Sequence, residues 1–298
     1  MSPSDERAAQ FLQTSSAWTE AAMEQLLPPG DEHPSELYRA MRYSVFGGGK
    51  RLRPALCYAA AAACGGEARD FWPVACALEF VHTYSLIHDD LPALDNDEYR
   101  RGRPTNHRVF GEAMALLAGD ALLTLAFETV LRAPAESAVT VRLARELAVA
   151  SGGLGMVAGQ AADMLGEDRA LDFGQLRFIH SRKTGALLRA AVRMGAIAAG
   201  GSDEALDALS GYAERIGLAF QIVDDILDVT GSASALGKSP GADAAHGKST
   251  YPALMGLDES RREVRRLTDE AVELLAGARL TQTGVLEDLA HFLVRRDR

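Results

Sequence analysis

The hydrophobic and polar positions of this chain repeat with the spacing of helices. Within the long segments, apolar residues return every three or four positions, and clusters of Gly, Pro or Ser separate one segment from the next. Runs of β-branched residues are scarce while Ala and Leu dominate, a composition that favours helix over sheet. Helices are predicted over residues 4–27, 34–46, 71–91, 111–132, 136–150, 172–199 and 202–229, with one more around residues 160–163 and two or three at the C-terminal end. The pattern predicts an all-α protein, a large bundle of ten or more helices.

One of these helices places acids on an otherwise apolar surface. No Gly or Pro interrupts residues 218–230, and apolar side chains cover most of the helix circumference, as is typical of a buried helix. The remaining face, at positions i, i+3, i+4 and i+7, carries Gln221, Asp224, Asp225 and Asp228. Buried carboxylates are costly unless a positive group neutralises them. The helix therefore predicts positive charge next to it.

A second acidic cluster ends the predicted helix 71–91. One face of that helix carries, at the same spacing, His82, Ser85, Leu86 and Asp89. Pro92 then disturbs the helix, and Asp95 stands six residues after Asp89, which does not return it to the same face of a regular helix. A bulge at residues 92–93 would bring Asp95 back beside Asp89, with Arg100 and Arg101 just beyond.

Two such clusters indicate a particular chemistry. Ligand sets made only of oxygen select hard cations, and we expect Mg²⁺, which combines a few carboxylates with water and substrate phosphates. The basic residues available to a polyphosphate between the clusters are Arg100, Lys183 and Lys238. A second basic set is available for a second anionic ligand and comprises Lys50, Arg53 and Arg101, with His82 nearby. Lys50 and Arg53 follow three glycines, which allow the backbone to approach a ligand closely. The arrangement predicts metal-assisted ionisation or hydrolysis of a diphosphate.

Composition and missing motifs exclude other classes. A net charge of −10 argues against a nucleic-acid partner. The sequence contains no Walker-type loop, no Gly-x-Ser-x-Gly elbow and no Cys-x-x-Cys pair, so nucleotide kinases, serine hydrolases, redox dithiols and zinc sites are unsupported. The apolar run at residues 54–64 is too short to cross a bilayer, and we expect no membrane span.

The remaining features concern organisation and location. Residues 1–10 are polar and acidic, unlike a signal peptide. The three cysteines, Cys57, Cys64 and Cys76, lie in apolar helical context and are expected to be reduced core residues of a cytoplasmic protein. No repeat of fixed period and no linker divides the chain, so residues 1–298 are predicted to form a single domain.

Five ordered motifs resemble those of the trans-polyprenyl diphosphate synthases. They are Gly48-Gly49-Lys50-Arg51-Leu52-Arg53-Pro54, Asp89-Asp90-x4-Asp95 with Arg100-Arg101-Gly102, Lys183-Thr184-Gly185, Phe220-Gln221-x2-Asp224-Asp225-x2-Asp228 and Gly247-Lys248-Ser249-Thr250-Tyr251-Pro252. The likeness runs from about residue 36 to residue 256. The first acidic motif carries the two-residue Pro-x insertion of the bacterial farnesyl diphosphate synthases, which the chain resembles most.

The resemblance implies a role for each motif. Metal ligation would fall to Asp89, Asp95 and Asp224, supported at one remove by Asp90, Asp225 and Asp228. The allylic diphosphate would be held by Arg100, Lys183 and Lys238. Isopentenyl diphosphate would be bound by Gly49, Lys50, Arg53, His82 and Arg101, with Lys248 as a further substrate contact. Thr184 and Gln221 would steady the allylic cation. A closing role for Arg295 and Arg296 over the second diphosphate stays open.

The resemblance also implies the reaction and its components. Members of the family are all-α homodimers with a deep central cavity, and they bind Mg²⁺, here three ions per active site, which Mn²⁺ can replace. They ionise dimethylallyl or geranyl diphosphate, couple the cation to isopentenyl diphosphate, and lose a proton, for which the released pyrophosphate is the proposed base. No side chain of this sequence stands out as an alternative base.

The residues just before the first acidic motif bear on product length. Tyr84 and Ser85 lie five and four residues before Asp89, roughly 6–8 Å along a helix. A hydrocarbon tail hanging from the bound diphosphate passes this level, and in the family a bulky residue here stops the tail at fifteen carbons. The expected product is therefore farnesyl diphosphate, although Tyr84 is equally suited to a core position. The alternatives are a geranyl or geranylgeranyl diphosphate synthase of the same family.

More distant alternatives rest on single motifs. His88-Asp89 allows a His-Asp type metal phosphohydrolase, which would leave Asp224, Asp225 and Asp228 unused. Glu79-x-x-His82 has the spacing of a di-iron site, but the sequence holds no second copy. A terpene cyclase would have no need for a second diphosphate site, and a non-catalytic subunit typically loses the acidic motifs that this chain retains.

Overall fold

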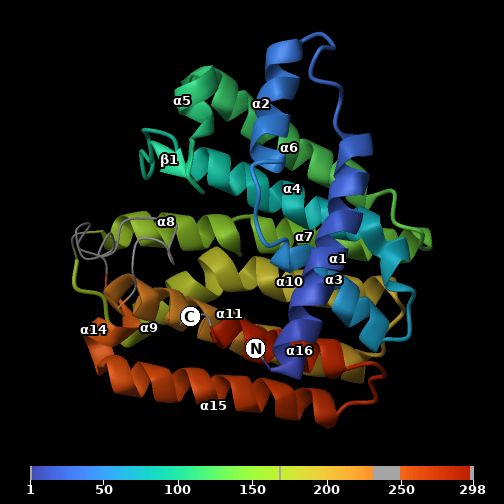
Figure 1. Ribbon diagram of the computed structural model, residues 1–298, viewed down its shortest axis with the longest axis vertical. Coiled ribbons are helices and arrows are strands. Elements are labelled where there is room, and N and C mark those ends of the chain that lie inside the picture. Colours follow the sequence, from blue (N-terminus) through green and yellow to red (C-terminus); the bar gives the residue numbers. More distant parts are fainter. Residues whose placement is uncertain (1, 168, 231–248, 296–298) are drawn as a thin grey trace.

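The computed structural model describes residues 2–167, 169–230 and 249–295, and these are almost entirely helical (Figure 1). The helices of the N-terminal half are α1 (Pro3–Leu26), α2 (Ser35–Val45), α3 (Leu52–Ala63), η1 (Ala68–Phe71), α4 (Trp72–Asp89), α5 (Asn106–Phe110) and α6 (Glu112–Val130). Those that follow are α7 (Ser137–Ser151), α8 (Met156–Gly166), α9 (Phe173–His180), η2 (Ser181–Gly185), α10 (Ala186–Ala198), α11 (Asp203–Thr230), α14 (Tyr251–Met255), α15 (Leu257–Ala276) and α16 (Gly284–Val294). The predicted all-α bundle of ten or more helices is confirmed. The deep central cavity and the single domain stay predictions.

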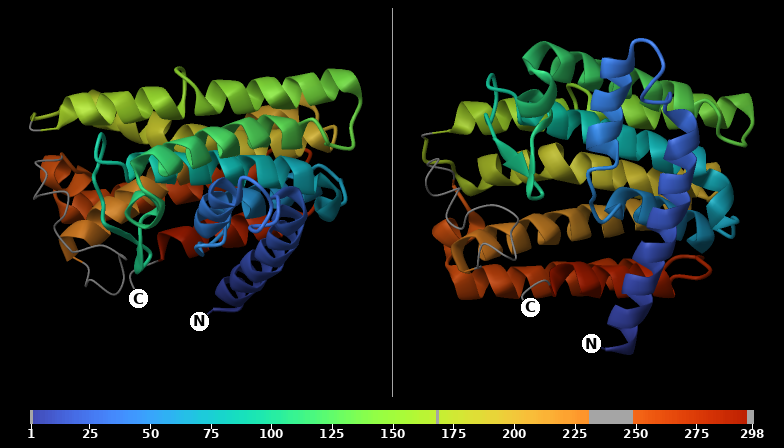
Figure 2. Two further views of the ribbon diagram at one scale, coloured as in Figure 1. Left: turned by 90° about the horizontal axis from the view of Figure 1, so that it is seen from above. Right: turned by 45° about the horizontal axis from the view of Figure 1, so that its top comes forward.

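The long helices form layers that one helix crosses. In Figure 1, α8, α10, α11 and α15 run in broadly the same direction, and α1 crosses the array steeply. The view from above separates α7 and α8 on one side from α11 and α16 on the other, with α4 and α10 between (Figure 2). The two chain ends meet, because Arg7 lies 2.7 Å from Asp288 and Arg295 lies 3.2 Å from Asp5. The ends of α1 and α16 are thereby fastened together.

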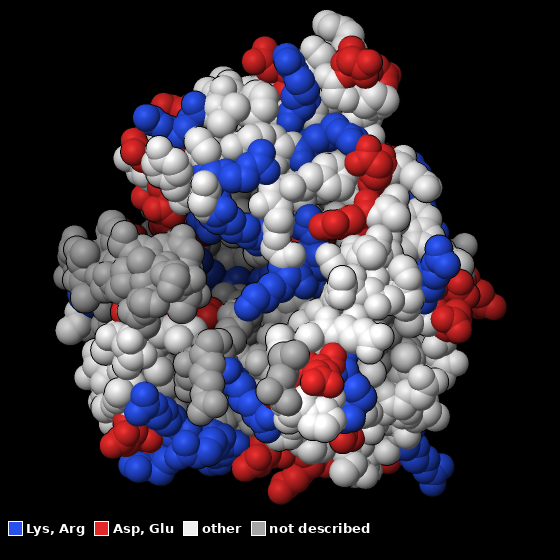
Figure 3. Space-filling model, in the orientation of Figure 1, with Lys and Arg blue, Asp and Glu red and all other residues white. Residues whose placement is uncertain are grey.

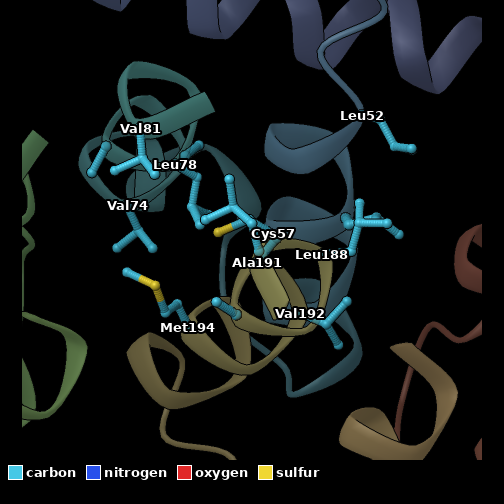
Figure 4. Close-up of a cluster of buried hydrophobic side chains, with 14 of the residues drawn as sticks. Leu52, Cys57, Val74, Leu78, Val81, Leu188, Ala191, Val192 and Met194 are labelled. Carbon is cyan, nitrogen blue, oxygen red and sulfur yellow. The ribbon is translucent and has the colours of Figure 1, made fainter. Parts of the chain in front are cut away.

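Helices α3, α4 and α10 meet in the core. Small side chains let these helices approach closely, and Cys57, Leu78 and Met194 fill the space between them (Figure 4). All three cysteines are free thiols, with Cys57 and Cys76 buried. Burial raises the pKa of both thiols far above the ordinary value, so neither is a reactive thiolate.

Gly195 on α10 marks the closest approach between α10 and α3. A Cβ atom there would lie 2.1 Å from the carbonyl oxygen of Cys57, which is backbone and has no room to move aside. We expect Gly195→Ala to lower the free energy of unfolding by about 2–3 kcal/mol through this overlap. Gly284→Ala is the matched control, because nothing lies within 4 Å of its added Cβ. Chemical denaturation of both variants measures the difference, and equal stability of the two would contradict the prediction.

The predicted helix 172–199 is divided by one turn of π-helix. α9 ends at His180, residues Ser181–Gly185 form the π turn η2, and α10 begins at Ala186. Turns of this kind are frequent at functional sites, and they turn side chains away from the regular helical direction. The side chains affected here are those of Lys183 and Thr184. The structure thus shows a local change of winding within the predicted helix.

Helix α6 differs from expectation in its hydrophobicity. In the described part of the chain, residues Glu112–Val130 are long and apolar enough to cross a bilayer by length and composition, with 39% of the window buried inside the protein. From the sequence we expected that no apolar run would be long enough to span a bilayer, and this run passes that test by length and composition. Core helices of soluble proteins pass the same test, and α6 packs against α4 over most of its length. Its outer face carries the exposed side chains of Leu116 and Leu117.

Candidate active site

The end of α4 and the turn after it bring two aspartates together. The backbone N–H of Asp95 donates to the carbonyl oxygen of Asp89 at 2.9 Å, and that of Asn96 donates to Leu91 at 3.1 Å. The chain thus folds back after Pro92, as the sequence analysis suggested. Burial raises the pKa of Asp89, and the nearby Asp95 carboxylate raises it further, while the Lys183 ammonium opposes both effects. The two carboxylates form a crowded anionic site with a cation beside it.

Asp90 points to a different partner from its neighbour Asp89. Its buried carboxylate accepts hydrogen bonds from Arg100, 2.8 Å from Nε and 2.6 Å from Nη2. Arg100 stands on β1 (Tyr99–Arg100), which pairs with β2 (Arg103–Pro104) in a short hairpin. Burial lowers the pKa of Arg100, but the Asp90 carboxylate outweighs this, and the net shift is upward. Asp90 therefore orients Arg100, a residue expected to contact a diphosphate.

Lys183 connects two helices at the π turn. Its Nζ lies 2.8 Å from Asp163 on α8 and 3.9 Å from Asp89 on α4. Gly159 permits this proximity, because a Cβ there would lie 2.1 Å from the Lys183 backbone nitrogen. Burial lowers the pKa of Lys183, but Asp89 and Asp163 outweigh it, and the pKa is raised. The side chain is therefore an ammonium throughout the physiological range. No role was predicted for Asp163 from the sequence, although Asp163 lies four residues after Gly159 on the same helix.

A chain of hydrogen bonds links the π turn to the second acidic cluster. Thr184 Oγ1 donates to Gln221 Oε1 at 3.1 Å, and Gln221 Nε2 donates to Asp224 Oδ2 at 3.2 Å. Thr184 is the neighbour of Lys183, which faces Asp89. The first acidic cluster is thus joined to the second through consecutive residues of one turn. The π turn thus links the aspartate end of α4 to the acidic face of α11.

Asp225 has contacts that the sequence did not indicate. Its carboxylate accepts the backbone N–H of Tyr251 at 2.9 Å and lies 3.3 Å from His180 Nε2. His180 in turn stacks on the Tyr251 ring, with centroids 5.7 Å apart. These contacts tie α14 and α9 to α11, so the carboxylate supports neighbouring helices. Asp228 is buried on the same helix.

The second basic set surrounds the glycine turn before α3. Gly48 and Gly49 have φ values of 91° and 130°, which side chains rarely adopt. Arg101 Nη1 donates to the carbonyl oxygen of Gly48, which joins the hairpin to this turn. Burial lowers the pKa of His82 well below its usual value, with Arg53 and Arg101 adding to the effect, so the imidazole is neutral. Burial also lowers the pKa of Arg53 to about 10. Figure 3 shows Lys and Arg side chains around a hollow on this face.

The structure does not test three of the predicted substrate-binding or closing residues. Lys238, Lys248 and Arg296 lie outside the described residues. Arg295 is described, and its Nη1 lies 3.2 Å from Asp5 and 3.4 Å from the Ser2 hydroxyl. Its contacts are with the start of α1, away from the glycine turn. Ser85 donates its hydroxyl to the His82 carbonyl at 2.8 Å, within its own helix.

Comparison with known proteins decides the assignment. Residues 34–281 match the family model of the polyprenyl synthetases. The chain belongs to the polyprenyl synthetase family. It is 50% identical over 270 residues to the large subunit 1 of a heterodimeric geranylgeranyl pyrophosphate synthase of Arabidopsis thaliana, covering 88% of this chain and 73% of the relative. It is 49% identical over 236 residues to the farnesyl diphosphate synthase of Geobacillus stearothermophilus, covering 78% and 80%.

A solved structure agrees with these relatives. The FPP/GFPP synthase of Zymomonas mobilis superimposes with a TM-score of 0.87 at 35% identity, covering 97% of this chain and 99% of that one. This polyprenyl synthetase is accordingly a prenyltransferase with the all-α isoprenoid synthase fold. The His-Asp phosphohydrolase and di-iron alternatives lose their basis. Glu79 of the would-be di-iron motif pairs instead with Arg51, at 2.9 Å.

The acidic clusters of this family member suit a hard cation that is shared with substrate. Within residues 2–167, 169–230 and 249–295, no three His, Cys, Asp or Glu side chains are arranged to hold an ion alone. Mg²⁺ fits such a site, because it keeps several waters and takes one or two carboxylates together with phosphate oxygens. Asp89 and Asp95 offer only oxygen, and burial together with their mutual repulsion raises the pKa of Asp89, an effect that a divalent cation would reverse.

Proposed function

We propose that this polyprenyl synthetase makes farnesyl diphosphate by condensing dimethylallyl and then geranyl diphosphate with isopentenyl diphosphate in the presence of Mg²⁺. The observation that carries the proposal is the connection from Asp89 through Lys183 and Thr184 to Gln221 and Asp224. It places one cationic side chain and two polar ones between two acidic clusters. The second basic set adjoins it through the hairpin, since Arg100 and Arg101 are consecutive.

Each group has a role in this reaction. Asp89, Asp95 and Asp224 would hold Mg²⁺, up to three ions, with Mn²⁺ as a substitute. Bound Mg²⁺ supplies neutralisation of the charge that develops on the departing pyrophosphate. Lys183 and Arg100 hold the allylic diphosphate, while the oxygens of Thr184 and Gln221 face the carbon skeleton as the allylic cation forms.

The second substrate is bound on the other side of the hairpin. Lys50, Arg53 and Arg101 hold isopentenyl diphosphate, and the neutral His82 imidazole contributes a hydrogen bond. After the new carbon–carbon bond forms, one proton leaves, and the released pyrophosphate is positioned to accept it. The held orientation of two bound diphosphates converts a bimolecular coupling into a reaction within one complex.

Incubation with radiolabelled isopentenyl diphosphate, dimethylallyl diphosphate and Mg²⁺, followed by product sizing, tests the proposal. We expect condensation that EDTA abolishes and that excess Mg²⁺ or Mn²⁺ restores. Absence of any condensation product with correctly folded protein would overturn it. Product sizing also distinguishes geranyl, farnesyl and geranylgeranyl diphosphate. This distinction is needed because the relatives are named as synthases of products of different chain length.

A buried ring below the first acidic motif supports the fifteen-carbon product. Tyr84 is 7% exposed, and its ring meets that of His88 edge to face, with centroids 5.6 Å apart. His88 Nε2 lies 3.1 Å from the Leu116 carbonyl oxygen on α6. The buried Tyr84 ring therefore packs against a histidine that is itself anchored to α6, which limits its freedom to move aside for a longer chain. This rigidity favours farnesyl diphosphate.

Tyr84→Ala is expected to lengthen the product to twenty carbons or more. The removed ring leaves space one to two turns below Asp89, into which a longer tail extends. Chromatographic sizing of the products measures the change. Tyr84→Phe is the matched control, since it keeps the ring and should keep farnesyl diphosphate as the product. An unchanged product length in Tyr84→Ala would remove Tyr84 as the limit.

The exposed apolar face of α6 supports a homodimer. Leu116 and Leu117 are 47% and 52% exposed, and apolar patches of this kind commonly mark protein interfaces. We infer a cytoplasmic homodimer, although one relative is named as a heterodimer subunit. Light scattering on the purified chain distinguishes a dimer from a monomer that awaits another subunit.

A further inference from the structure

A buried arginine lies beneath the glycine turn and stabilises it. Arg51 is 2% exposed and stands at the start of α3 with a φ of 48°, a conformation that costs energy for a residue with a side chain. Its Nη2 donates to the Val45 carbonyl oxygen at 2.5 Å, across the turn. Arg51 directly follows Lys50 and stands two residues before Arg53.

Two carboxylates from different helices hold the Arg51 guanidinium. Glu79 on α4 accepts from Nη1 at 2.9 Å, and both residues of this pair are almost fully buried. Glu20 on α1 accepts from Nε at 3.2 Å and from Nη2 at 3.1 Å. Hydrogen bonds to two carboxylates and one backbone carbonyl hold the guanidinium in one orientation. The strained backbone at Arg51 is maintained by these contacts.

Glu79 also acts on the arginines that face the ligand. Burial lowers the pKa of Arg53 and of Arg101, and the Glu79 carboxylate opposes the effect at both. Its second oxygen, Oε2, is buried without a hydrogen bond among the described residues, as is Arg53 Nε. A buried acid with spare hydrogen-bonding capacity beside three arginines serves as their shared counter-charge. Glu79 thus contacts Arg51 directly and acts on Arg53 and Arg101 through its charge.

Glu20 extends this network to a helix outside the matched family region. That region begins at residue 34, whereas α1 ends at Leu26. Glu24 lies one turn further along α1 and pairs with Arg42 on α2, whose guanidinium lies over the Phe46 ring. The two glutamates are similarly exposed, at 44% and 56% of the side chain. They differ in which arginine they hold.

We propose that Glu20, Arg51 and Glu79 are positioning residues for the isopentenyl diphosphate half of the active site. They hold the glycine turn so that Lys50 and Arg53 face the ligand before it binds, and they do not touch it themselves. The inference rests on the proposed function. It makes α1 a contributor to substrate binding in addition to its place in the core.

Steady-state kinetics of Glu20→Gln beside Glu24→Gln test the inference. We expect Glu20→Gln to raise KM for isopentenyl diphosphate about fivefold, with kcat and KM for the allylic substrate near wild type, because only the second site loses its support. Glu24→Gln should leave all three constants unchanged. Equal KM values for isopentenyl diphosphate in the two variants would overturn the inference.

Glu79→Gln provides a second, larger test. It removes the buried charge while keeping the shape, and we expect KM for isopentenyl diphosphate to rise more than about tenfold. Glu146→Gln breaks another partly buried ion pair, with Arg193, and should lower Tm without changing that KM. A fall in Tm with unaltered KM in Glu79→Gln would assign it a structural role alone. If Glu79→Gln fails to fold, the Glu20 comparison decides. If the wild type forms no condensation product, the proposed function itself is wrong. If the wild type forms the product but the glutamine variants share its KM for isopentenyl diphosphate, only this inference is wrong.

Discussion

Asp89→Asn is expected to lower kcat/KM by at least about a thousandfold while raising the Tm of the substrate-free protein. The loss follows because the Asp89 carboxylate lies beside Asp95 and Lys183, at the point where Mg²⁺ and the allylic diphosphate would meet. An amide keeps the shape of the side chain but cannot neutralise a divalent cation. The gain in stability has a different cause, which is the removal of a buried negative charge from the substrate-free site.

The sign of the stability change follows from the direction of the pKa shift. Burial and the Asp95 carboxylate raise the pKa of Asp89 above its ordinary value of 3.8. A carboxyl whose pKa is raised by folding contributes stability below pH 3.8, and it loses that contribution as pH rises through its value in the folded state. Ionised Asp89 therefore costs stability at neutral pH. The neutral amide of Asp89→Asn avoids this cost, so its Tm should exceed that of wild type near pH 7, and the difference should vanish only below pH 3.8.

Differential scanning calorimetry at several pH values, together with activity assays, measures both effects on the same preparations. Asp269→Asn removes an exposed carboxylate on α15 and serves as the control for net charge. Added Mg²⁺ with an unreactive diphosphate should raise the Tm of wild type more than that of Asp89→Asn. A variant with lower Tm and lower activity would indicate misfolding, and would contradict the account of Asp89 as a ligand in a strained anionic site.

Local spacing explains why part of the site could be predicted from the sequence. On α11, Gln221 and Asp224 are three residues apart and remain in contact at 3.2 Å, as helical geometry requires. The turn after α4 was also foreseeable, since Pro92 ends the helix and Asp95 needed a bulge to return to Asp89. Both inferences depend on residues close together in the chain, where backbone geometry leaves few alternatives.

Contacts between distant segments account for what the sequence did not predict. Asp163 becomes a partner of Lys183 because Gly159 lets α8 pack against η2, and no local pattern encodes that approach. Asp225 was placed on the same predicted face as Asp224, as a support rather than a ligand, but one residue along a helix turns a side chain by about 100°. It therefore reaches His180 and Tyr251.

The ion pairs at the glycine turn likewise could not be predicted from the sequence. Arg51 had the appearance of one more basic residue in a run that includes Lys50 and Arg53. Its burial against Glu20 and Glu79 depends on how α1, α3 and α4 cross. The fold class, by contrast, depends on a hydrophobic pattern summed over the whole chain, and errors at single positions do not alter it.

Lys183→Met is expected to reduce kcat/KM for the allylic diphosphate by roughly a hundredfold to a thousandfold. The methionine keeps most of the length but removes the ammonium that lies 2.8 Å from Asp163 and 3.9 Å from Asp89. Because this ammonium lowers the pKa of Asp89, its loss should move that pKa upward. The acidic limb of the kcat/KM profile should consequently move to higher pH, which a merely weakened fold would not produce.

The neighbouring arginine provides the control for Lys183→Met. Arg182 belongs to the same π turn, but its guanidinium is exposed and donates to the Leu154 carbonyl oxygen at 2.6 Å. Arg182→Met should leave the pH profile and the allylic KM close to wild type, and Lys183→Arg should recover part of the activity because it restores a cation. The comparison separates charge at one atom from disturbance of the turn. If the acidic limb of the pH profile does not move in Lys183→Met, then Lys183 does not control the ionisation of Asp89. That result would contradict the proposed charge interaction between η2 and α4.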